Sequence, residues 1–136
     1  MSDTDSQVSA RRRWGAVAAL AAVLLVASVV PVGDGVPANA GDTGVSLFDI
    51  AHVVGYAALA WTLIRALWLS HESEAVGVTS HGVVLAGAVL LTVAYGVGIE
   101  VMQGVLGPRS FGVDDIALNA VGAGLGVAAR VLARRG

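Results

Sequence analysis

The chain has 136 residues, of which 56% are hydrophobic and only 13% are charged; soluble domains carry roughly a quarter charged residues, so this composition is typical of a membrane protein. The net charge of -2 argues against a nucleic-acid-binding protein, which would carry a basic surface. The sequence has no cysteine and no lysine, which excludes disulfides, zinc–thiolate sites, thiol nucleophiles, Schiff-base chemistry and a P-loop.

Four long apolar stretches follow one another along the chain. A helix that spans a bilayer needs about 20 mostly apolar residues, and each stretch approaches or exceeds that length. We expect spanning helices at residues 14–32, 48–69, 82–106 and 114–132. The sequence therefore predicts an all-α, polytopic membrane protein with one domain, residues 14–133, that forms a bundle of four transmembrane helices.

The segment before the first apolar stretch has two interpretations. Its first ten residues are polar and acidic, so we expect residues 1–13 to form a disordered tail. Three arginines, an apolar run and the small residues at 38–40 also resemble a cleavable signal peptide. The apolar run of about 18 residues is longer than the usual 7–15, which favours its retention as a helix.

The arginines predict the orientation in the membrane. Three of them precede the first expected helix and three more lie at the end of the fourth. By the positive-inside rule, both of these ends are cytoplasmic. The connection at 31–47 carries aspartates and no arginine, so it faces outward, as does the connection at 107–113. We therefore expect a multi-pass protein of the cell membrane with both termini cytoplasmic.

Polar side chains gather at the expected outer ends of the last three helices. Their spacing of three or four residues puts the members on each helix on one face. Because the three faces lie at the same depth, we expect one site or one interlocked hydrogen-bond network. This polar set, which supplies the ligand-binding candidates, comprises Asp49, His52, Tyr56, Glu100, Gln103, Arg109, Asp115 and Asn119.

Each member of the polar set also has a structural interpretation. A buried Glu or Asn in a membrane bundle often hydrogen-bonds across helices and fixes their packing. Asp114 and Asp115 could cap the fourth helix, with Arg109 paired to them. Ionisable residues within spanning segments are functional candidates by default, so both interpretations stay open for the set, and Asp114 alone is expected to be a cap.

The other distinctive residues are interpreted as scaffold. Small residues let membrane helices approach closely, and the candidates are Gly55, Gly96, Gly98, Gly122 and Gly126. Tryptophans are expected to anchor or pack the helices. The spacing of His71, Glu72, Glu74 and His81 matches no standard metal site, so we expect no metal and no cofactor.

Three motifs run through residues 46–130. H-x-x-x-Y joins His52 to Tyr56, and E-x-x-Q joins Glu100 to Gln103. The third, R-x-x-x-x-x-D-x-x-x-N-x-x-G, runs from Arg109 to Gly122 and is the most specific, because it fixes four residues at set spacings. Together they resemble the VanZ-like family of small integral membrane proteins, which implies a multi-helix protein of the cell membrane.

The chain departs from the pattern of that family at two positions. The family usually has Lys three residues before the histidine, where this chain has Asp49. The family often has Asp three residues after the arginine, where this chain has Gly112. Loss of the lysine reverses a charge at the mouth of the site, so recognition of an anionic group would differ here.

Several functions are compatible with these residues. The first is binding or modulation of a lipid or a lipid-linked envelope precursor at the outer leaflet, with Arg109 as a bidentate anion contact. The second is a membrane enzyme acting on a lipid-linked substrate, with His52 as general base; Ser110 lies nearby but in no nucleophile elbow, so no catalytic residue is assigned.

Two further interpretations remain. A transporter is the least favoured, because the inner halves of the expected helices offer almost no polar residues. A purely structural polar network is the other. The expected partners are membrane lipids and not nucleic acid, and oligomers are compatible with the sequence.

Overall fold

A computed structural model describes residues 3–29, 46–71, 79–106 and 112–134. These residues form four helices, α1 (Asp3–Val29), α2 (Leu47–His71), α3 (Thr79–Leu106) and α4 (Val113–Leu132), and include no strand. Each helix contains a segment long and apolar enough to cross a membrane. The predicted all-α architecture with four membrane-spanning helices is therefore confirmed.

The helix bounds agree with the expected ones except at the first helix. α2, α3 and α4 begin and end within three residues of the expected positions. α1 begins at Asp3, so residues 3–13 are helical where a disordered tail was expected. Their Gln, Ala and Arg residues have high helix propensity, and extension of an existing helix adds one hydrogen bond per residue fixed. Residues 30–32 of the expected first helix lie outside the described residues.

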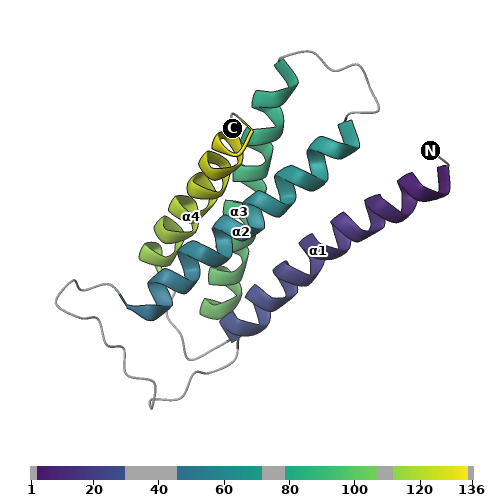
Figure 1. Ribbon diagram of the computed structural model, residues 1–136. Coiled ribbons are helices and arrows are strands. Elements are labelled where there is room, and N and C mark those ends of the chain that lie inside the picture. The colour runs from purple at the N-terminus through teal and green to yellow at the C-terminus, as the bar shows by residue number, and fades with distance from the viewer. Residues whose placement is uncertain (1–2, 30–45, 72–78, 107–111, 135–136) are drawn as a thin grey trace.

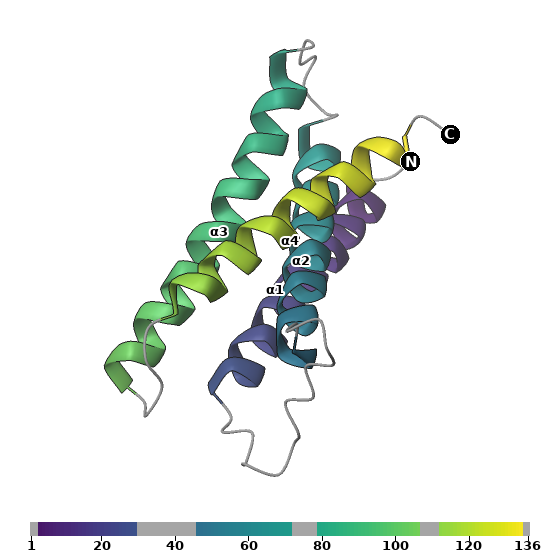
Figure 2. The same ribbon diagram turned by 90° about the vertical axis from the view of Figure 1, so that its left-hand side faces the viewer.

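α2 occupies the centre of the bundle. It packs against α1, α3 and α4, whereas the described residues of α1 contact α2 and α3 but not α4. Figure 1 shows α1 and α4 on opposite sides of α2, and Figure 2 shows α3 and α4 side by side. The start of α1 and the end of α4 lie at the same end of the bundle in both views, as an even number of spans requires.

Two glycines bring α4 against the backbone of α2. A Cβ atom at Gly122 would lie 2.6 Å from the Val53 carbonyl oxygen, and one at Gly126 would overlap the Ala57 carbonyl oxygen. Only a residue without a side chain permits this approach, as predicted for small residues between membrane helices. The face of α4 that carries Asp115 and Asn119 is thereby pressed onto α2. Gly98, by contrast, has open space where a side chain would lie.

The half of the bundle that contains the C-terminal part of α4 has an apolar interior, and arginines lie at its tip. Leu63, Ile64 and Trp68 of α2 pack with residues of α3 in the hydrophobic core. The Arg134 guanidinium carbon lies 3.5 Å from the centre of the Trp68 ring, and Arg130 lies 5.4 Å from it. Such cation–π contacts hold arginine side chains against aromatic faces. The tryptophans of α2 therefore pack and anchor this end, in line with the expectation for them.

Candidate functional site

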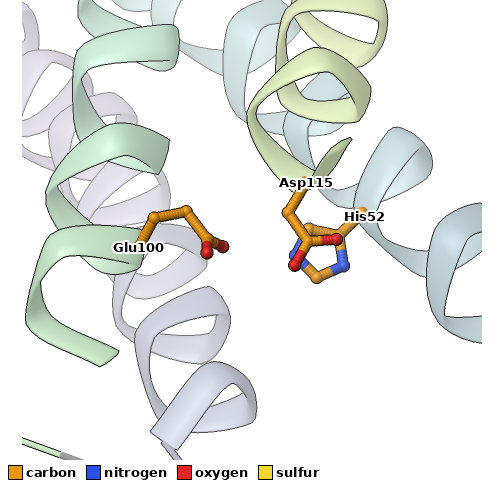
Figure 3. Close-up of side chains that lie close together, drawn as sticks. All are labelled: His52, Glu100 and Asp115. Carbon is orange, nitrogen blue, oxygen red and sulfur yellow. The ribbon is translucent and has the colours of Figure 1, made fainter. Parts of the chain in front are cut away.

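Three side chains from three helices converge near the opposite end of the bundle. His52 of α2, Glu100 of α3 and Asp115 of α4 each place one ligand atom within 4.8 Å of the others. Figure 3 shows the Glu100 carboxylate extending from α3 toward Asp115 and His52 on the facing helices. We call these three residues the carboxylate–histidine cluster. Residues remote in sequence thus meet at one level, as the spacing of the polar set predicted.

Glu100 is the buried member of the carboxylate–histidine cluster. Its side chain is 1% exposed, and its Oε2 accepts a hydrogen bond of 3.2 Å from the backbone N–H of Gly112. Gly112 is the N-cap residue of α4 and has no side-chain cap hydrogen bond. The carboxylate therefore lies by the positive end of the α4 dipole. The bond also ties the last turns of α3 to the first turn of α4.

His52 is oriented by its own helix. Its Nδ1 lies 3.2 Å from the Phe48 carbonyl oxygen, one turn earlier in α2. Its ring stacks on Tyr56 with a centroid separation of 6.0 Å and an interplanar angle of 17°. A neutral ring that donates through Nδ1 keeps a lone pair on Nε2. The arrangement therefore offers Nε2 as the free base or ligand atom.

Asp115 approaches the cluster because its neighbour in the turn is a glycine. A Cβ atom at Gly112 would lie 2.9 Å from Asp115 Oδ2. Asp115 is half-buried, whereas Asp114 is exposed. α4 has no side-chain cap hydrogen bond, so the expected capping bond from Asp114 is not formed. Both aspartates lie in the first turn, where negative charge favours the helix dipole.

A second polar layer lies one turn deeper in the bundle. It consists of Tyr56, 2% exposed, and Asn119, 0% exposed, packed around Gly96. A Cβ atom at Gly96 would overlap the Asn119 amide and lie 3.0 Å from Tyr56 Cε1. Neither amide atom of Asn119 has a hydrogen-bond partner among the described residues. Buried polar groups are normally partnered, so Asn119 is the unusual member of this layer.

Sequence reasoning missed one polar residue on the same face of α3. Thr92 is 1% exposed, and within the described part of the chain its Oγ1 has no partner. The signal was present, because Thr92, Gly96 and Glu100 are four residues apart and share a helix face. Polar groups thus continue from the cluster toward the middle of the membrane-spanning segment.

Other members of the polar set lie elsewhere. The Asp49 carboxylate accepts a 2.7 Å hydrogen bond from the Ser46 N–H, and the Asp49 N–H donates to Ser46 Oγ at 3.1 Å. This reciprocal pair is a capping box at the start of α2. Gln103 Nε2 donates to the Ser28 carbonyl oxygen of α1 at 2.6 Å. The structure therefore uses both residues for helix capping and packing, while Arg109 lies outside the described residues.

Within the described part of the chain, the carboxylate–histidine cluster has no arginine partner. No arginine of the described ranges forms an ion pair with Glu100 or Asp115, whose nearest ligand atoms lie within 4.8 Å. Two ionised carboxylates at this separation would repel by about 3 kcal/mol at an effective dielectric constant of about 20. A proton, a metal ion or a positively charged group would remove such a repulsion, so the described residues of the cluster favour a positively charged partner.

The residues considered for a metal from the sequence do not form this cluster. His81 packs edge-on against Trp68, with ring centroids 5.3 Å apart, at the other end of α3. Glu72 and Glu74 lie outside the described residues. Only the folded arrangement brings His52 together with Glu100 and Asp115, because sequence spacing alone does not show which helix faces meet.

Comparison with known proteins identifies a family. No curated protein and no solved structure matches this chain. The family model described as VanZ/LLP1 matches residues 6–134, nearly the whole chain. The matched range includes all three motifs on which the resemblance rested and all four membrane-spanning helices. This multi-pass membrane protein therefore belongs to the VanZ/LLP1 family.

Proposed function

We propose that this protein binds a polar head group of a membrane lipid, or of a lipid-linked envelope component, through the carboxylate–histidine cluster. The observation that carries the proposal is the burial of Glu100 beside Asp115 and His52. Burying a carboxylate next to another one is unfavourable unless a partner compensates the charge. A ligand that binds here would supply that compensation.

The depth of the cluster suits a lipid head group. Glu100 and His52 lie five residues from the ends of their spanning segments, at Val105 and Leu47. At 1.5 Å per residue this is about 8 Å, close to the boundary of the hydrocarbon core. Asp115 lies nearer still to the end of its segment. A head group could therefore reach the cluster while its acyl chains stay among the apolar side chains outside the bundle.

The two ends of the bundle support an outer-leaflet location for this site. The opposite end carries Arg130 and Arg134 against the tryptophans of α2, and α1, whose first half carries the N-terminal arginines, begins at the same end. The positive-inside rule makes that end cytoplasmic. Under this proposal both termini are cytoplasmic and the cluster faces the outer surface of the cell membrane.

Binding is favoured over catalysis by the residue types present. The three residues of the cluster are one base and two carboxylates, the chain has no cysteine, and Ser110 lies outside the described residues. A reaction on a lipid-linked substrate would have to proceed through a water molecule activated by His52. Binding requires no such additional component, and we keep hydrolysis as the second candidate because a His52 ring that donates through Nδ1 to Phe48 has a lone pair on Nε2.

Native mass spectrometry of the full chain in mild detergent tests this proposal. The wild type is compared with Glu100→Gln, Asp115→Asn and Arg109→Ala. Asp114→Asn is the matched control, because it removes an equal charge from an exposed neighbour. We expect a co-purified lipid adduct in the wild type and the control that is lost in Glu100→Gln and Asp115→Asn. Loss of the adduct in Arg109→Ala as well would show that Arg109 also contacts the lipid, as an anion-binding residue.

Two results would contradict the proposal. Identical adducts in all variants would place lipid binding elsewhere on the protein. Absence of any adduct, together with lower thermal stability in Glu100→Gln and Asp115→Asn, would identify the cluster as a structural network that fixes helix packing.

A further inference from the structure

We infer that the carboxylate–histidine cluster is a binding site for a divalent transition-metal ion of the Zn²⁺ or Mn²⁺ type. The ligands are one ring nitrogen of His52 and one carboxylate oxygen each from Glu100 and Asp115. This inference goes beyond head-group binding, because all three ligands come from the chain itself. The ion would be held whether or not a lipid is bound.

The separation of the ligand atoms suits a single ion. Since all lie within 4.8 Å of one another, a central point exists no more than about 2.8 Å from each, which is 4.8 Å divided by √3. Zinc bonds to imidazole nitrogen and carboxylate oxygen measure about 2.0–2.2 Å. Side-chain rotations that move each ligand atom by less than about 1 Å would close the site. No movement of the helices is needed.

The surroundings of His52 resemble those of a metal-binding histidine. Such a histidine almost always donates its second ring N–H to a carboxylate, a backbone carbonyl or water, which fixes the tautomer and the ring orientation. Here Nδ1 faces the Phe48 carbonyl oxygen at 3.2 Å, and the ring stacks on Tyr56. Nε2 is therefore the nitrogen that remains for an ion.

The carboxylates are held in a similar way. The Gly112 N–H engages Glu100 Oε2, and the absence of a side chain at Gly112 gives Asp115 room to approach. Hydrogen bonds to ligating carboxylates are a regular part of metal sites. A divalent cation would also balance the two negative charges that no arginine of the described ranges neutralises.

An independent observation points to a ligand beside the cluster. Asn119 lies one turn along α4 from Asp115, is 0% exposed, and has no described partner for either amide atom. Its amide packs between Gly96 and Tyr56, which lie one turn from Glu100 and His52 respectively. Unpartnered buried amides are rare in native proteins. An ion-bound water or ligand oxygen would give this amide a partner.

The donor set selects among metals. Imidazole suits zinc, iron, nickel and copper, and the two carboxylates also suit manganese, whereas magnesium and calcium favour oxygen ligands alone. Three protein ligands leave at least one coordination position for water or for a phosphate oxygen. A metal ion would thereby let a site with two carboxylates accept an anionic head group, although the lysine usual in the family is replaced by Asp49.

Metal content measured on delipidated protein tests this inference. The full chain, with any affinity tag removed, is stripped with a chelator and dialysed in detergent against micromolar Zn²⁺, Mn²⁺ or Mg²⁺. Bound metal is then measured by mass spectrometry of the elements. We expect one Zn²⁺ or Mn²⁺ per chain, a higher Tm in its presence, and no comparable effect of Mg²⁺.

Substitutions locate the ion. His52→Ala and Asp115→Asn should each weaken binding at least tenfold, since loss of outer-shell partners alone costs about 10–100-fold. The controls Asp114→Asn and His81→Ala should bind as the wild type does, because neither residue belongs to the cluster. Circular dichroism of the helices identifies variants that do not fold. Asp115→Asn is the decisive test of the metal site, because the substitution is isosteric and Asp115 is half-buried.

The outcomes separate this inference from the proposed function. Metal at the level of the detergent blank in the wild type would overturn the inference, and so would equal metal in Asp115→Asn and Asp114→Asn. Lipid retained by metal-free protein would leave the proposed function standing when the metal site fails. Metal bound without any retained lipid would support the metal site and contradict the proposed function.

Discussion

Replacement of Gly122 by alanine should push α4 away from α2 and destabilise the bundle. A Cβ atom at this position would lie 2.6 Å from the Val53 carbonyl oxygen and 3.1 Å from Tyr56 Cβ. Backbone atoms cannot rotate away as a side chain can, so the helices themselves must separate. To reach ordinary contact at 3.4 Å, the distance to the oxygen must grow by about 0.8 Å.

The magnitude follows from a comparison within one helix. Gly124→Ala adds the same methyl group to α4, where nothing lies within 4 Å of the new atom. Both substitutions share the gain in helix propensity, roughly 0.5–1 kcal/mol. Only Gly122→Ala carries the overpacking cost, typically about 1–3 kcal/mol. The difference between the two variants should therefore be about 1–3 kcal/mol in favour of Gly124→Ala.

Reversible unfolding in mixed micelles, followed by tryptophan fluorescence, measures this difference. Trp61 and Trp68 lie in α2, so their emission reports on separation of the helices that pack against it. The movement should also draw Asp115 away from His52 and reduce the metal bound at the cluster. Equal unfolding free energies for Gly122→Ala and Gly124→Ala would refute the argument that α2 and α4 are in backbone contact.

Three further predictions concern single contacts. Tyr95→Phe removes the hydrogen bond that the Tyr95 hydroxyl donates to the Ala21 carbonyl oxygen at 2.5 Å; we expect a loss of about 1 kcal/mol in the same unfolding assay, and an unchanged midpoint would contradict the bond. Thr92→Val removes a buried hydroxyl without a described partner and should raise stability by up to about 1 kcal/mol, whereas a large destabilisation would mean that the hydroxyl is engaged. Gly112→Ala adds a methyl group 2.9 Å from Asp115 Oδ2. Measured by elemental mass spectrometry, the Gly112→Ala protein should retain less metal than the Gly124→Ala protein, and equal retention in the two variants would exclude a role for this close approach.

The helices and their level in the membrane could be predicted from the sequence because both follow from local patterns. Apolar length fixed where α2, α3 and α4 lie, and a spacing of three or four residues fixed which polar groups share a face. Short connections and an even number of spans then put His52, Glu100 and Asp115 at one end. Each of these inferences needs only neighbouring residues.

The rotation of each helix about its axis could not be predicted in this way. Gln103 follows Glu100 by three residues, yet it donates to Ser28 of α1 while Glu100 turns toward α4. That outcome depends on which helices pack together. The capping role of Asp49 could have been predicted from the sequence, because Ser46 lies three residues earlier and the pair matches a capping box. There the sequence contained the signal and its structural meaning was overlooked.

The way α1 is attached to the bundle has a consequence for the evolution of this sequence. Tyr95 and Gln103 of α3 both bond to main-chain carbonyl oxygens of α1, at Ala21 and Ser28. No described side chain of α1 is fully buried. Main-chain oxygens are the same in every residue, so these two bonds depend on the backbone path of α1, while side chains such as Val17 and Leu24 add apolar contacts. Substitutions should therefore accumulate far more freely in α1 than in α4, as long as the segment stays helical and apolar.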